Sequence, residues 1–167
     1  MFGFVQKIIL SIITLGIAGL FLFACYFLFI EESRGVNFNN IFPILLAVFG
    51  SVSFVFHLKT IRFYKTQSLQ NLNFDNHKVF WGLNLAFIIT LVLLAIFFIY
   101  QFSTMYAGQP YNMEEDMLLG FFIVILVPVL VSVWLFLDIR FLYRNKLRLE
   151  RKEKLDAIDN IKGTRNS

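Results

Sequence analysis

The chain has 167 residues, of which 58% are apolar and only 16% are charged, and its formal net charge is +4. A soluble domain usually has about half of its residues apolar and about a quarter charged. Together with a mean hydropathy of +0.71, these values exclude a soluble globular enzyme, a disordered chain and a coiled coil, and they predict a multi-pass membrane protein.

Four apolar runs are long enough to cross a bilayer as helices. A hydrocarbon core about 30 Å thick needs about 20 residues at about 1.5 Å rise per residue, and the runs cover residues 8–30, 41–63, 79–102 and 117–142. The second run reaches residue 63 only if the charged ends of Lys59 and Arg62 extend to the interface. Because lipid cannot satisfy open backbone groups, and no strand-like alternation appears, we expect an all-α transmembrane four-helix bundle.

The basic residues are unevenly distributed between the two sides of this bundle. Of the 15 Lys and Arg residues, only Arg34 lies in the connections at residues 31–40 and 103–117. The positive-inside rule therefore predicts that both termini and the 64–78 connection face the cytoplasm, and the composition favours a bacterial inner membrane. A cleaved lipoprotein-like signal ending at Cys25 is the alternative. The apolar run continues to Ile30, however, which favours a retained first span.

Small residues recur at helical spacing on three of the spans. The longest set is Gly82, Ala86 and Thr90 on the third span, and shorter sets lie on the first and second. In lipid, helices associate through close packing at such positions rather than through apolar burial. We expect the sets to pack within the bundle; contact with a second copy of the chain, giving a homo-oligomer, is the alternative.

Pro128 lies in the middle of the fourth span. It removes one backbone hydrogen bond and clashes with the carbonyl of residue 124, so a kink is expected there. Ser132, one turn further on, is positioned to bond a nearby carbonyl. We interpret the kink as a static feature of shape rather than as a gating hinge.

Polar residues near the predicted inner face are the candidate site: His57, Arg62, Asn84 and Asp138. Ionisable groups at membrane depth are costly and often functional. Asp138 has no basic residue three or four positions away, so we expect it to pair with Arg62, Lys59 or His57 across the bundle. A hydrated Asp138 in the headgroup layer is the alternative. No catalytic motif or metal-ligand spacing is present, and we expect no catalytic residue, cofactor or metal site.

The C-terminal segment, residues 143–167, is predicted to be a basic cytoplasmic tail. It reads as helix over 139–162, which either continues span four or breaks from it near Asn145, with Gly163 as the stop. Basic residues repeat every four positions: Arg140, Arg144, Arg148 and Lys152. We expect this ridge to contact anionic lipid headgroups. Docking of a soluble or membrane protein partner is the alternative, and nucleic acid is disfavoured.

One local stretch, KTIRFYKTQSLQNL at residues 59–72, resembles the segment that follows the Pro-Gln pair in PQ-loop proteins, a superfamily of small sugar and amino-acid transporters. Phe56-His57 stands where that pair would be. The resemblance implies a three-helix repeat, here spans two to four, that dimerises around a substrate path.

Two functions follow from these features. The first is a non-enzymatic membrane interaction protein acting with a partner, such as a sensor, an accessory or immunity protein, or an oligomeric pore-type subunit. The alternative is a small-solute facilitator with a PQ-loop-like cytoplasmic turn.

Overall fold

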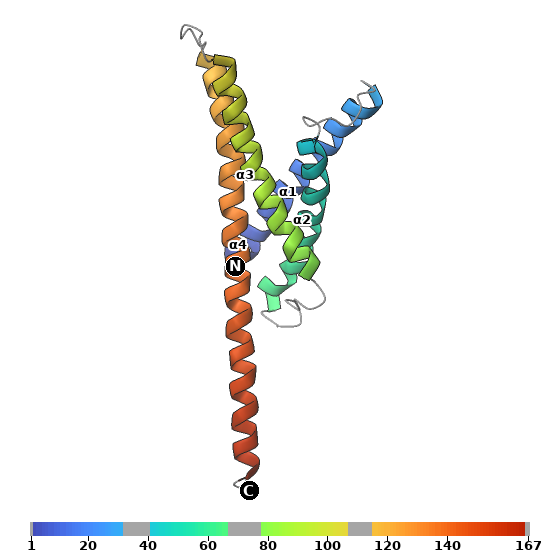
Figure 1. Ribbon diagram of the computed structural model, residues 1–167. Helices are drawn as coiled ribbons and strands as arrows, with labels where there is room; N and C mark the ends of the chain where they lie inside the picture. Colours follow the sequence, from blue (N-terminus) through green and yellow to red (C-terminus); the bar gives the residue numbers. More distant parts are fainter. Residues whose placement is uncertain (1, 32–40, 67–77, 107–114, 166–167) are drawn as a thin grey trace.

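The computed structural model describes residues 2–31, 41–66, 78–106 and 115–165, and every described residue is helical. The elements are α1 (Phe2–Tyr26) with a short π-helical continuation, η1 (Phe27–Glu31), then α2 (Ile41–Thr66), α3 (Lys78–Tyr106) and α4 (Glu115–Arg165) (Figure 1). All four α-helices contain a stretch long and apolar enough to cross a membrane. This confirms the prediction of a helical chain with four such helices.

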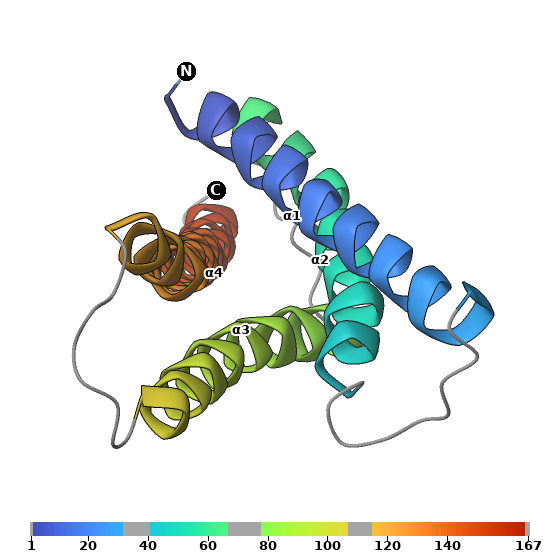
Figure 2. The same ribbon diagram turned by 90° about the horizontal axis from the view of Figure 1, so that it is seen from above.

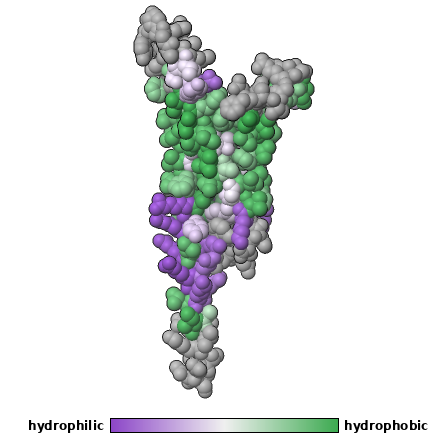
Figure 3. All heavy atoms as spheres, in the orientation of Figure 1, coloured by the Kyte–Doolittle hydropathy of each residue, from purple (hydrophilic) through white to green (hydrophobic). Residues whose placement is uncertain are grey.

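The start of α1, the end of α2 and the start of α3 lie at the same end of the molecule, and α4 extends well beyond this end (Figure 1). This end is referred to below as the basic end, because it carries Lys7, Lys59, Arg62, Lys78 and Arg140. Figure 3 shows an apolar band over the helices and a hydrophilic surface that begins where α4 leaves them. The connections at 32–40, 67–77 and 107–114, which carry part of the orientation argument, lie outside the described residues.

The main helix contacts follow chain order: α1 packs on α2, α2 on α3 and α3 on α4 (Figure 2). The closest approach is between α1 and α2, where a Cβ placed on Gly50 would lie 3.3 Å from the Cβ of Ala18. Ala18 belongs to the small-residue set on the first span and Gly50 lies beside the set on the second, so these two helices approach closely through small residues within the chain. The set on α3 differs, because Gly82 is exposed and nothing lies within 4 Å of its would-be Cβ.

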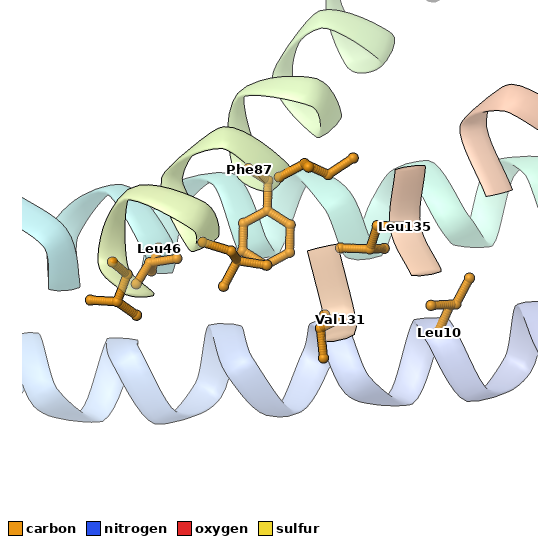
Figure 4. Packing of buried hydrophobic residues seen from close by; sticks show 8 residues of the cluster. Leu10, Leu46, Phe87, Val131 and Leu135 are labelled. Carbon is orange, nitrogen blue, oxygen red and sulfur yellow. The ribbon is translucent and has the colours of Figure 1, made fainter. Parts of the chain in front are cut away.

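The larger buried core joins all four helices. Phe87 of α3 is completely buried, and Leu10, Leu46, Val131 and Leu135 surround it from the other three helices (Figure 4). A smaller cluster lies nearer the basic end and comprises Phe56, Phe63 and Leu142. The two clusters pack the helices against one another. Side chains at the basic end that point between the helices are therefore removed from solvent.

Helix α4 is a single continuous element of 51 residues. It passes through Asn145 without a break, so the tail continues span four; the predicted stop at Gly163 is wrong, because α4 ends at Arg165. The helix is also continuous through Pro128, and the Ser132 hydroxyl donates to the Pro128 carbonyl at 2.6 Å. The expected kink at Pro128 stays a prediction.

Candidate functional site

The most polar buried site surrounds Asp138 at the basic end. The Lys7 ammonium forms an ion pair with Asp138 Oδ2, and the Tyr64 hydroxyl donates to Asp138 Oδ1 at 2.8 Å. The Nδ1 atom of His57 lies 3.7 Å from Oδ2. These four residues, named the ionic clasp, come from α1, α2 and α4 and tie the three helices together.

Helical periodicity explains why the ionic clasp is buried. Lys7 shares one face of α1 with Leu10 and Thr14, three and seven positions further on, and all three are completely buried. Asp138 likewise continues the buried face of α4 that carries Val131 and Leu135. Each charged residue therefore lies on a stripe that faces the other helices, and on α4 this stripe continues past Asp138 to the buried Leu142. The two stripes meet at the basic end.

Aromatic rings surround the Lys7 ammonium. Its Nζ lies 5.0 Å from the ring centroid of Phe56 and 5.8 Å from that of Tyr64, within the range of cation–π attraction. The Tyr64 ring stacks on Phe141 of α4, with centroids 5.7 Å apart and an interplanar angle of 11°. The pair thus has charge, hydrogen-bond and ring partners, which offset the cost of placing two ions out of water.

A second polar contact lies deeper, between α2 and α3. The Ser53 hydroxyl donates to Asn84 Oδ1, and both residues are completely buried. Within the described part of the chain, neither Asn84 Nδ2 nor the two ring nitrogens of His57 have a hydrogen-bond partner. The hydroxyls of Thr14 and Thr90, by contrast, bond to carbonyls one turn back on their own helices.

The structure brings together part of the predicted site. Asp138 and His57 are neighbours, but the cation beside Asp138 is Lys7, which was not among the expected partners Arg62, Lys59 and His57. The Lys59 ammonium lies over the Phe80 ring, 4.0 Å from its centroid. Burial of Asp138 to 3% exposure argues against the hydrated alternative. One signal could have found Lys7: its spacing of seven from the polar, inward-facing Thr14.

The other two predicted residues, Arg62 and Asn84, do not belong to the ionic clasp. Arg62 is exposed on α2, and Asn84 contacts Ser53 rather than the ionic clasp. The four residues of the predicted basic ridge are all exposed on α4: Arg140, Arg144, Arg148 and Lys152.

An apolar cavity of about 480 Å³, named the lateral groove, lies between α1, α3 and α4, further from the basic end than the ionic clasp. Its walls come from Ile13–Phe21, Leu91–Phe98 and Ile123–Val131, and almost all the lining surface is apolar. Gly16 contributes no side chain, and nothing lies within 4 Å of its would-be Cβ. The volume is in the range of ligand pockets, yet the lining offers no reactive group.

Among the residues that the structure describes, no three His, Cys, Asp or Glu side chains are grouped so as to hold a metal ion. Comparison with protein-family models, with curated proteins and with solved structures finds no match. The PQ-loop resemblance of residues 59–72, of which 67–72 lie outside the described residues, therefore carries no family assignment.

Proposed function

We propose that the protein is a non-enzymatic multi-pass membrane interaction protein, acting with a partner as a sensor, accessory, immunity or pore-type subunit. It crosses a bacterial inner membrane as a four-helix bundle, with the basic end, both termini and the C-terminal part of α4 in the cytoplasm. The orientation is supported by the basic residues gathered at one end of the helices. The observation that carries the function is the lateral groove.

We assign the lateral groove to one transmembrane helix of the partner. Because its three walls belong to membrane-crossing helices, an occupant reaches it from within the bilayer and must itself be apolar. Helix association in lipid depends on close packing at small residues. Gly16 supplies such a position in the groove, as Gly50 does where α1 meets α2. The groove is smaller than a helix about 10 Å across, so it takes the side chains of one helix face.

A matched pair of glycine variants tests this assignment. Gly16 and Gly19 are both exposed on α1, and a Cβ on either would meet nothing within 4 Å, but only Gly16 lines the groove. Gly16→Leu therefore fills the groove without disturbing the fold, and Gly19→Leu serves as its control. Photo-crosslinking residues at positions 20 and 22 provide the readout, because Leu20 lines the groove and the similarly exposed Leu22 does not.

We expect one discrete protein adduct from position 20 in whole cells and none from position 22. Gly16→Leu should abolish this adduct, whereas Gly19→Leu should leave it unchanged. An adduct that is insensitive to Gly16→Leu, or that forms equally from both positions, would contradict the assignment. An adduct with twice the mass of the chain would make the occupant a second copy, and lipid adducts alone would make it lipid; either result overturns a partner helix.

The second candidate function, a small-solute facilitator, is favoured by one observation. Polar side chains with unpartnered nitrogen atoms, His57 and Asn84, are completely buried between membrane-crossing helices. Buried polar groups without partners are uncommon and often mark a path for a ligand or water. Saturable solute flux into proteoliposomes containing only this chain, lost in Asn84→Leu, would replace the interaction function with this one.

A further inference from the structure

The surface of α4 just beyond the ionic clasp carries two adjoining cavities. The first, of about 210 Å³, lies between the end of α2 and α4 and is lined by Phe63, Tyr64, Phe141, Asn145, Arg148 and Leu149. The second, of about 220 Å³, is lined by Arg144, Leu147, Arg148 and Arg151. Because Arg148 borders both, the two cavities meet at its side chain.

The second cavity has a concentrated positive charge. Arg144, Arg148 and Arg151 are spaced at i, i+4 and i+7, which puts them on one face of α4. Within the described part of the chain, no hydrogen bond or ion pair engages these three guanidinium groups. Glu150 lies on the opposite face, two positions from Arg148, and pairs with Lys146 at 3.2 Å. The arginine face is therefore left without a neutralising partner there.

The first cavity is of a different kind, because its walls are mostly aromatic and aliphatic. Phe141 and Leu149 line it from α4, and Phe63 lines it from α2. Its lining also includes the polar side chains of Asn145 and Arg148. A ligand that spans both cavities needs an anionic group for the arginines and hydrocarbon for the aromatic walls.

We propose that this paired site binds a phospholipid with an anionic headgroup, with the phosphate at Arg148 and its neighbours Arg144 and Arg151, and the start of an acyl chain along Phe63 and Phe141. Guanidinium groups bind phosphate oxygens through two parallel charge-assisted hydrogen bonds. Basic pockets between transmembrane helices bind acidic lipid headgroups in the same way. The site differs from general attraction to a charged membrane, because only some of the basic residues on α4 line it.

The test compares two arginines on the same helix. Arg140 is exposed like Arg148 but lines neither cavity. Purified full-length protein in a neutral detergent is titrated with fluorescent phosphatidylglycerol, with labelled phosphatidylcholine as the neutral comparison and inorganic phosphate as the competitor. We expect Arg148→Gln to weaken phosphatidylglycerol binding about tenfold or more, Arg140→Gln to weaken it about twofold or less, and Arg148→Lys to retain part of it.

Each contrary outcome overturns the site. Equal losses in Arg148→Gln and Arg140→Gln would mean a diffuse basic surface, and no loss in either would mean that lipid binds elsewhere. Competition by millimolar inorganic phosphate would indicate a soluble anion as the ligand, and equal binding of phosphatidylcholine would remove the role of headgroup charge. Unchanged helicity and elution volume show that the variants fold. The result is independent of the lateral groove, so the lipid site and the partner helix can fail separately.

Discussion

The ionic clasp makes a quantitative prediction for Lys7→Met. This change keeps a long side chain on α1 but removes the cation beside Asp138, a carboxylate whose side chain is only 1% exposed. It also ends the contact of the Lys7 ammonium with the Phe56 ring. Asp138 keeps the hydrogen bond from Tyr64, so the carboxylate loses its counter-ion but not all of its partners.

The expected loss follows from these contacts. Removing one member of a buried ion pair costs about 3–5 kcal/mol, because the other charge is left uncompensated. The surviving Tyr64 hydrogen bond, of the charge-assisted kind that contributes about 1.5–3 kcal/mol, places Lys7→Met near the lower end, at about 3 kcal/mol. Replacing both partners by apolar residues, in Lys7→Met/Asp138→Leu, should cost much less than the sum of the single changes.

Unfolding in mixed micelles of increasing dodecyl sulfate content, followed by circular dichroism, measures these free energies. Lys152→Met is the control, because Lys152 is exposed on α4 and its removal should change stability by less than about 0.5 kcal/mol. A loss in Lys7→Met no greater than in the control would contradict a stabilising ion pair between Lys7 and Asp138. So would additive losses of Lys7→Met and Asp138→Leu in the double variant, since coupling is the signature of the pair.

Two further predictions concern contacts between neighbouring helices. Gly50→Leu should destabilise the protein by about 1–3 kcal/mol, because its side chain would meet Ala18 of α1, whereas Gly82→Leu enters open space and should be nearly neutral in the same unfolding assay; equal losses would mean that α1 and α2 do not approach as described. Asn84→Leu should change stability by less than about 1 kcal/mol, because interhelical hydrogen bonds in membranes are weak and the variant removes a buried unpartnered amide. A loss above about 2 kcal/mol would give the contact between Asn84 and Ser53 a larger role than its geometry supports.

The four spans could be predicted from the sequence because each depends on local composition. A run of about 20 apolar residues is sufficient evidence for a membrane-crossing helix. Helix α1 with its continuation η1 contains the first predicted run, and α2, α3 and α4 contain the other three. Continuation of α4 past Asn145 was one of two predicted alternatives, since helix propensity alone does not decide between a break and a continuous helix.

The partner of Asp138 could not be predicted in the same way. Lys7 is 131 positions away, and its approach depends on how α1 packs against the other helices, which no local pattern encodes. Lys59 and Arg62 were expected as its partners because, like Asp138, they lie near the predicted inner face of the membrane. The lateral groove was also missed, because it depends on where three helices diverge. Of the three expected partners of Asp138, only His57 lies beside it in the structure. It could be predicted from its position near the end of a span.

The placement of the chain in the bilayer is the claim on which the clasp, the groove and the lipid site all depend. Fusions of a reporter that is active only in the cytoplasm test it directly, when attached in turn to the C-terminus, to the N-terminus and within the connections at 32–40 and 107–114. We expect activity at both termini and none at the two connections, with the protein retained in carbonate-washed membranes. An active reporter at either connection, or an inactive one at either terminus, would contradict it.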